Sequence, residues 1–303
     1  MSTAAQTTVS KTTAAQNTVT KNVVSVFKLR IAVVIALSAL GGVAVAEGPA
    51  PGFLELAVLT LAVILSSAAA GAFNQIWERD LDARMVRTRR RPFASGEWRA
   101  GPLWWALVAF ILALGVGMAA AVFNLTTAVH LFLGAFTYGV VYTVWLKQRT
   151  VWNIVIGGLA GSFAVLAGAA AVEPGLSTAP LILAVVLFLW TPPHFWSLAL
   201  MAKDDYAANG VPMLPLVKGV RFTAWAILLH AVALAVLAML PVFFGMGWIY
   251  GIAALAGGGW FVKTSVDLVR RPGRPAAFAN FKASLGQLSL LLVGAMLDAA
   301  LIG

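Results

Sequence analysis

The chain has 303 residues, of which 61% are hydrophobic and only 11% are charged. Soluble proteins carry about 45–50% apolar and roughly 25% charged residues, so this composition excludes an ordinary soluble domain and predicts an all-α polytopic membrane protein. The absence of cysteine from the sequence excludes disulfides and thiolate metal sites. The formal net charge is +10, which would also suit a nucleic-acid partner, but the placement of the charges argues against one.

Residues 1–22 are rich in Ser, Thr, Ala and Gln and contain almost no large apolar side chain. Because such a segment cannot bury enough surface to fold, we predict a disordered cytoplasmic N-terminal segment over 1–22 and a single membrane domain over 23–303. The first apolar run ends in small residues at 44–47, as a signal-peptide cleavage site would. The polar region before that run is about 30 residues long, too long for a signal peptide, so we interpret the run as an uncleaved first span.

Nine apolar runs have the length of about 20 residues that a bilayer-crossing helix needs. The predicted spans are 29–47, 53–78, 103–123, 125–146, 151–172, 179–201, 221–243, 246–268 and 283–302. The connections after the first, third, fifth and seventh spans are short turns, whereas the other connections carry the charge. We therefore predict a bundle of nine transmembrane helices with a central cavity open toward the charged side.

All 21 Lys and Arg residues lie before the first span or around the connections that follow the even-numbered spans. Positive charge concentrates in cytoplasmic loops, so we expect a multi-pass protein of the bacterial inner membrane with a cytoplasmic N-terminus and a periplasmic C-terminus. The excess of positive charge then reflects membrane topology and attraction to anionic membrane lipids. Nucleic acid is therefore not expected as a partner.

A first polar cluster lies at the end of the second span. Asn74, Glu78 and Asp82 are spaced by four residues, so at about 100° per residue they share one helix face. Like charges at this spacing repel, and the C-terminal end of a helix disfavours anions. Both effects indicate a compensating hard cation, and Mg²⁺ prefers such oxygen ligands. The alternative is a solvated helix end with mixed charges.

Basic residues follow this cluster and return after the fourth span. Arg87 and Arg91 would share one face if the helix continued, and arginine suits phosphate because its planar group donates parallel hydrogen bonds. Lys147, Arg149 and Asn153 are expected at the same level of the membrane. These residues are either phosphate contacts or anchors at the level of the lipid head groups.

The sixth span contains a double proline and ends in an acidic pair. Pro192 and Pro193 predict a broken helix, which lipid tolerates only where protein or a cavity covers the break. His194 follows directly, either as a ligand of iron or a proton acceptor, or as a partner of the backbone freed by the kink. Asp204 and Asp205 have three interpretations. They bind a second cation, they contribute to the opposite side of the site that holds one diphosphate, or they are an ordinary juxtamembrane acidic pair.

Two stretches carry a family resemblance. "NQIWERDLDARMVRTRRRP" and "PPHFWSLALMAKDDYAANGVPMLP" resemble the membrane prenyltransferases of the UbiA superfamily, nine-helix bundles, and within it the protoheme IX farnesyltransferase (heme O synthase) family. The first family signature, Asn-x-x-x-Asp-x-x-x-Asp, is present here with Glu78 at the middle position, and Lys147, Thr150 and Asn153 fit a further motif. The second signature is often Asp-x-x-x-Asp, but here its acidic residues are adjacent.

The resemblance implies transfer of a farnesyl group from farnesyl diphosphate to a vinyl group of protoheme IX, or heme B. It implies Mg²⁺ as cofactor, bound by Asn74, Glu78, Asp82, Asp204 and Asp205, and His194 as a heme-binding residue. The implied diphosphate-binding residues are Arg87, Arg91, Lys147, Arg149, Asn153 and Lys203. A heme A synthase or a terminal oxidase is the partner expected to receive the product.

Two alternatives remain at this point. One is a related prenyltransferase that acts on a quinone precursor or chlorophyllide, against which the "PPHFW" and "GVPMLP" stretches argue. The other is a polytopic transporter, which would bind its substrate near the bilayer midplane. The charged clusters of this chain are predicted at the membrane surface instead.

Overall fold

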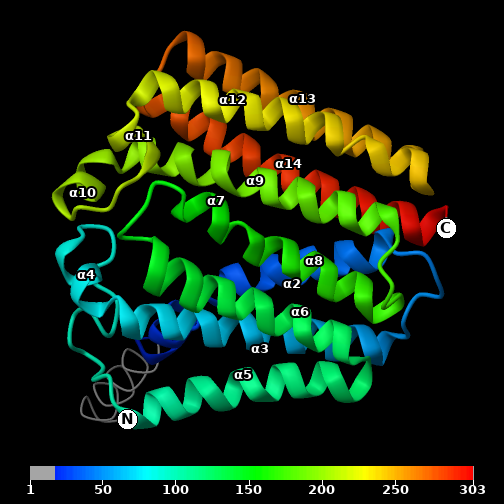
Figure 1. Ribbon diagram of the computed structural model, residues 1–303, viewed down its shortest axis with the longest axis horizontal. Coiled ribbons are helices and arrows are strands. Elements are labelled where there is room, and N and C mark those ends of the chain that lie inside the picture. The colour runs from blue at the N-terminus through cyan, green and yellow to red at the C-terminus, as the bar shows by residue number, and fades with distance from the viewer. Residues whose placement is uncertain (1–17, 303) are drawn as a thin grey trace, which may run out of the picture.

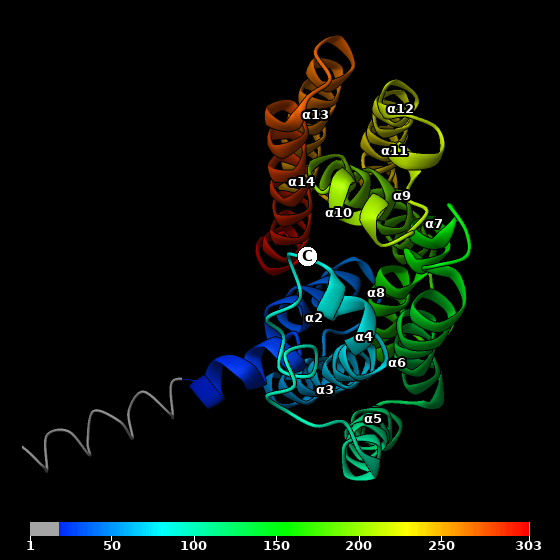
Figure 2. The same ribbon diagram turned by 90° about the vertical axis from the view of Figure 1, so that its left-hand side faces the viewer.

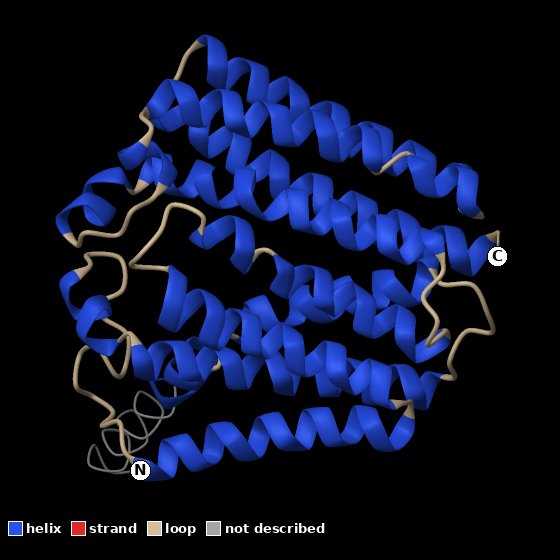
Figure 3. Ribbon diagram, in the orientation of Figure 1, coloured by secondary structure: helices blue, strands red, loops and turns tan. Residues whose placement is uncertain are grey.

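The computed structural model describes residues 18–302, which form a bundle of long helices lying alongside one another (Figures 1 and 2). Every regular element within that range is a helix (Figure 3). Eight helices are long and apolar enough to cross a membrane, and a ninth span results if Leu29–Val45 is joined with the helix Thr18–Val26, from which it is bent by 45°. The predicted all-α polytopic membrane class is thereby confirmed.

The spans follow the predicted order along the chain. They are α2 (Leu29–Val45), α3 (Phe53–Trp77), α5 (Pro102–Val122), α6 with η1 (Leu125–Phe136, Thr137–Leu146), α7 with α8 (Asn153–Gly157, Leu159–Val172), α9 (Thr178–Met201), α12 with η2 (Val220–Leu237, Leu240–Phe244), α13 (Trp248–Arg270) and α14 (Arg274–Leu301). Three short helices, α4 (Arg79–Arg84), α10 (Lys203–Ala208) and α11 (Leu214–Val217), lie in the charged connections. Figure 1 shows these three helices together at one end of the bundle, opposite the C-terminal end of α14.

Most predicted span boundaries lie within two residues of those in the structure, but the two ends of the chain differ more. The last helix begins at Arg274 rather than at 283, because an apolar run marks only the part of a helix that lipid surrounds and Pro275 starts the helix earlier. At the other end of the chain, residues 18–22 are helical although composition predicts disorder over 1–22. The rest of that predicted segment, 1–17, lies outside the described residues.

The sixth span is not broken at its double proline. Pro192 and Pro193 lie inside α9, which is one continuous helix. A proline removes only its own backbone donor, so the helix continues where neighbouring protein covers the exposed carbonyls. Gly158 lies against this segment, since a Cβ atom there would approach the Phe188 carbonyl oxygen to 3.3 Å. The prediction of a broken sixth span is therefore wrong; in the fifth span, Gly158 between α7 and α8 likewise keeps right-handed helical backbone angles.

The fourth span changes its winding partway through. After α6, residues 137–146 form a π-helix, and the amide of Lys147 bonds the carbonyl oxygen of Tyr142 at 2.9 Å, five residues earlier. Such wider turns are rare and are frequently found at functional sites. In a regular α-helix, Tyr138 and Lys147 would point about 180° apart.

The helices approach closely where small residues face each other. A Cβ atom added at Gly168 of α8 would lie 1.8 Å from the Ala39 carbonyl oxygen of α2, and one at Gly42 would lie 2.0 Å from the Val165 carbonyl oxygen. Small residues at such contacts let helix backbones pack directly, which is a main source of helix association in lipid. This contact joins α2 to α8 near the middle of the bundle.

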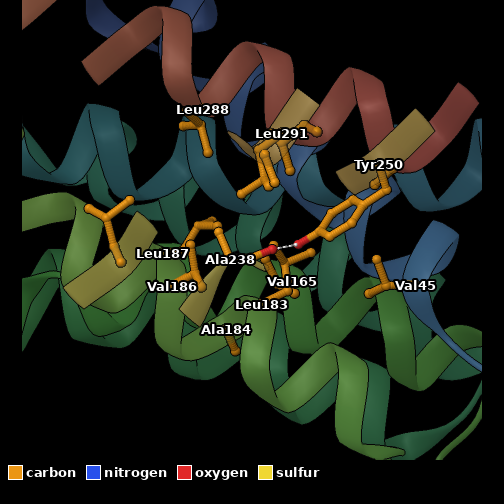
Figure 4. Close-up of a cluster of buried hydrophobic side chains, with 14 of the residues drawn as sticks. Val45, Val165, Leu183, Ala184, Val186, Leu187, Ala238, Tyr250, Leu288 and Leu291 are labelled. Carbon is orange, nitrogen blue, oxygen red and sulfur yellow. Dashed lines mark hydrogen bonds between the residues drawn. The ribbon is translucent and has the colours of Figure 1, made fainter. Parts of the chain in front are cut away.

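A larger cluster of buried apolar side chains unites α9, α13 and α14 with this pair (Figure 4). Tyr250 of α13 is completely buried in this cluster. Its hydroxyl donates a 2.8 Å hydrogen bond to the carbonyl oxygen of Ala238, as Figure 4 shows. The bond satisfies the one polar atom that this large side chain brings into the apolar core.

We expect Gly168→Ala to lower the melting temperature of the detergent-purified protein. The added methyl group collides with a backbone oxygen of α2 that cannot move without separating the helices, and overpacking of this kind costs about 1–3 kcal/mol. Gly161→Ala is the matched control, because a Cβ atom at Gly161 of the same helix meets nothing within 4 Å. Equal melting temperatures for the two variants would contradict the assigned α2–α8 contact.

Candidate functional site

A cavity of about 600 Å³ opens at the end of the bundle that carries the charged connections. Six residues that the sequence analysis singled out line it: Asn74, Glu78, Asp82, Arg87, Arg91 and Lys147. Apolar side chains such as Val24, Phe195 and Leu198 complete the wall. The cavity is therefore charged on one part of its surface and apolar on another.

The junction between α3 and α4 places the acidic cluster on the cavity wall. α3 ends at Trp77 and α4 begins at Arg79, but the helical pattern of backbone bonds continues through Glu78. The Glu78 amide bonds the Asn74 carbonyl oxygen at 2.9 Å, and the Asp82 amide bonds the Glu78 carbonyl oxygen at 2.7 Å. Asn74, Glu78 and Asp82 thus keep one common face, and all three are almost completely buried.

Each carboxylate of this cluster is paired with a basic side chain. Lys147 Nζ lies 2.5 Å from Glu78 Oε2, and Arg91 Nη1 lies 2.7 Å from Asp82 Oδ2. The second oxygen of Glu78, Oε1, is buried and has no hydrogen-bond partner. Buried carboxylates need such compensation, because an unpaired charge away from water is costly.

The side-chain oxygen of Asn74, the third member of the cluster, is also paired with a basic residue. In the sequence that residue served only as one of the positive charges that indicate membrane topology. Lys28, in the turn before α2, donates to Asn74 Oδ1 at 2.5 Å and to the Tyr138 hydroxyl at 2.6 Å. Asn74 Nδ2 donates in turn to Thr143 Oγ1 at 2.9 Å, which fixes the orientation of the amide. Lys28 lines the cavity together with its two partners, Asn74 and Tyr138.

The π-helix supplies one side of this arrangement. Tyr138, Tyr142 and Lys147 all line the cavity, although nine residues separate the first from the last. The two tyrosine rings are stacked, with their centroids 5.8 Å apart. A regular α-helix would have turned Lys147 away from the tyrosines, so no sequence period of 3.6 residues could have grouped the three residues.

The second acidic pair does not join the first cluster. Asp205 Oδ1 accepts a 3.0 Å hydrogen bond from the amide of Val86, and Asp204 is exposed. Neither aspartate lines the cavity. Within residues 18–302, no three Asp, Glu or His side chains are grouped closely enough to hold one cation. The structure thus links Asp205 to the arginine-bearing loop that follows α4.

Tyr206 is the residue of α10 that reaches the cavity. Burial is the main cause that raises the pKa of Tyr206, and the positive charge of Arg87 acts in the opposite direction. The phenol is therefore protonated at neutral pH. Tyr206 directly follows the second acidic pair in the sequence, so the cavity-lining residue of this segment is the neighbour of the two predicted aspartates.

Three further predicted residues lie outside the cavity lining. Arg149 is exposed, and Lys203 is partly buried. Asn153 is completely buried and donates from Nδ2 to the carbonyl oxygen of Lys147 at 3.1 Å. In this structure Asn153 therefore supports the backbone of a cavity residue.

His194 lies on the side of α9 that faces α14. Its Nδ1 is 2.8 Å from Ser284 Oγ, and its ring stacks on Trp190 and Phe281 with centroid distances of 4.3 and 4.6 Å. The next residue, Phe195, lines the cavity, whereas His194 does not. The helical turn of about 100° between neighbours separates the two side chains.

The chemical character of the cavity is clear from these positions. Asn74, Glu78 and Asp82 offer oxygen ligands for a hard cation such as Mg²⁺. The basic side chains beside them suit a phosphorylated group, and the apolar wall suits a hydrocarbon chain. An amphiphilic substrate with an anionic head and an apolar tail matches both parts.

The chain is similar to enzymes and structures of one family. A protein of Paramagnetospirillum magneticum named protoheme IX farnesyltransferase 2 is 58% identical over 279 residues, which are 92% of this chain and 97% of that protein. The fold resembles the solved structure of a digeranylgeranylglyceryl phosphate synthase, with a TM-score of 0.76 and 17% identity over 92% of this chain and 98% of that one.

It also resembles a UbiA homolog from Archaeoglobus fulgidus bound to GPP and Mg²⁺, with a TM-score of 0.70 and 14% identity over 89% of this chain and 99% of that one. At this level of identity the two solved structures support the fold alone. Residues 35–289 match the UbiA prenyltransferase family. The chain belongs to this family of membrane prenyltransferases.

Proposed function

We propose that this chain transfers the farnesyl group of farnesyl diphosphate to a vinyl group of protoheme IX, which gives heme O. The observation that carries the proposal is the cavity, in which an oxygen cluster, basic side chains and an apolar wall lie together. The proposed substrates follow from the 58% identity to a protein named protoheme IX farnesyltransferase 2. A transporter is disfavoured because the charged groups lie at the end of the bundle and not at its middle.

Asn74, Glu78 and Asp82 are proposed to hold Mg²⁺. The fit rests on Glu78 Oε1, a buried oxygen without a partner, and on the all-oxygen character of the three side chains. When bound, the ion supplies Lewis-acid neutralisation of the diphosphate charge. The 58% identity to a protein named protoheme IX farnesyltransferase 2 favours protoheme over a quinone precursor or chlorophyllide as the acceptor.

The other side chains of the cavity are proposed to bind the two parts of farnesyl diphosphate. Arg87, Arg91 and Lys147 bind the diphosphate and stabilise the charge that grows on it as the allylic C–O bond breaks. The apolar wall holds the farnesyl chain and excludes water from the allylic cation. Diphosphate leaves with the electron pair of the C–O bond, and the heme vinyl group then attacks the allylic cation to form the new C–C bond. Water adds to the carbocation that this attack leaves on the other vinyl carbon and loses one proton, which gives the hydroxyethyl-farnesyl substituent.

Membranes that contain this chain should form a heme more hydrophobic than protoheme, as seen by chromatography of the extracted hemes. Glu78→Gln and Asp82→Asn should each reduce its formation by orders of magnitude, since each removes a charged ligand. Asp267→Asn, at an exposed carboxylate of α13, is the control and should leave the heme profile unchanged. Unaltered hemes with the unmodified protein would exclude the proposed reaction, and active Glu78 and Asp82 variants would exclude only the site.

Asp205 is proposed to act by holding the loop that carries Arg87 and Arg91. Asp205→Ala removes the acceptor of the Val86 amide and should lower turnover, whereas Asp205→Asn retains an acceptor oxygen and should keep most of it. Asp204→Ala should lose less activity than Asp205→Ala, because Asp204 is exposed. If Asp205→Asn were as inactive as Asp205→Ala, the negative charge itself would be required and Asp205 would be a candidate metal ligand.

His194 is proposed to brace α9 against α14, and a direct contact with heme is the alternative. Loss of its bond to Ser284 should destabilise His194→Ala by about 1–3 kcal/mol, seen as a lower melting temperature, with heme and farnesyl diphosphate affinities unchanged. His130→Ala is the control, since Nδ1 of His130 bonds the Thr126 carbonyl oxygen of its own helix. A selective loss of heme affinity in His194→Ala would instead assign this residue to the heme site.

A further inference from the structure

Lys28 donates a hydrogen bond to an oxygen atom that is a proposed metal ligand. Its Nζ donates to Asn74 Oδ1 at 2.5 Å, and the amide of Asn74 is held in that orientation by its bond to Thr143. The other contact of the lysine is the Tyr138 hydroxyl. Asn74 therefore presents its only side-chain oxygen to a basic side chain.

The other two proposed ligands show the same pattern. Glu78 is paired with Lys147 at 2.5 Å, and Asp82 is paired with Arg91 at 2.7 Å. Each of the three ligand groups thus contacts a different basic residue, and the three basic residues come from separate parts of the chain. A cation that enters this cluster displaces those contacts or lies next to them, and like charges at such short range repel strongly.

We propose that Lys28 exchanges partners when substrate binds: it releases Asn74 to the metal ion and turns its ammonium group to the diphosphate. This inference rests on the proposed function and deepens it. A lysine suits such an exchange because its charge is compact and its four-carbon stem is flexible. Lys28 lines the same cavity as Arg87 and Arg91, so the diphosphate lies within its reach in that proposal.

The exchange couples the two ligands of the site. Metal alone must compete with Lys28 for Asn74 and then lie beside an ammonium group that has lost its partner. Diphosphate alone draws Lys28 away and frees the oxygen that the metal needs. Each ligand therefore strengthens the binding of the other, and linkage makes the two effects equal.

The test uses Lys28→Met, which keeps the length of the side chain and removes its charge. Mn²⁺ binding without diphosphate, and binding of inorganic diphosphate in the presence of a chelator, are measured on the full chain in detergent by isothermal titration. Mn²⁺ should bind the variant roughly fivefold more tightly or better, and diphosphate should bind more weakly by a similar factor. Lys218→Met removes one charge from an exposed residue outside the cavity and should change neither affinity.

The directions in which the Mn²⁺ and diphosphate affinities change distinguish the exchange from a structural role of Lys28. Unchanged Mn²⁺ affinity in Lys28→Met would overturn the exchange and leave the proposed metal site intact. Weaker binding of both ligands, with a lower melting temperature, would make Lys28 a structural brace and also overturn it. If the unmodified chain bound no Mn²⁺ at all, the proposed metal site itself would fail, and the exchange with it.

Discussion

The burial of two carboxylates, Glu78 and Asp82, at the junction of α3 and α4 is the constraint on which the site depends. Each is at most 2% exposed, and the removal of such a charge from water costs several kcal/mol unless a partner compensates it. The compensation comes from Lys147, directly after η1, and from Arg91 in the loop after α4. Neutralisation of these charges therefore requires that three segments meet at one cavity: the α3–α4 junction, the end of η1 and the loop after α4.

The bundle makes this convergence possible because its spans pack through small residues. Close contacts such as Gly168 against α2 fix the positions of the helices without polar groups in the apolar middle. Polar side chains can then gather at one end, where α4 and α10 close the bundle. The wider winding of η1 is compatible with this arrangement, because it turns Tyr138 and Lys147 toward the same cavity.

The same packing explains why some conspicuous sequence features lie elsewhere. His194 and the double proline stand out in the sequence, yet the aromatic rings of Trp190 and Phe281 surround the imidazole on the side toward α14. Asp204 stands next to Asp205, but only the latter contacts the loop after α4. Distinctive residues such as His194 and Asp204 thus lie in segments that border the cavity, but their own side chains do not line it.

The amino-acid sequence alone was enough to predict the all-α class, the order of the spans, the end of the bundle that carries the charge, and the common face of Asn74, Glu78 and Asp82. These features follow from local periodicity and composition, which need no knowledge of distant contacts. Local patterns did not predict that Lys28 pairs with Asn74, that Tyr206 reaches the cavity, or that α9 continues through its double proline. Those outcomes depend on which helices pack together, and on a π-helix whose winding no 3.6-residue pattern reveals.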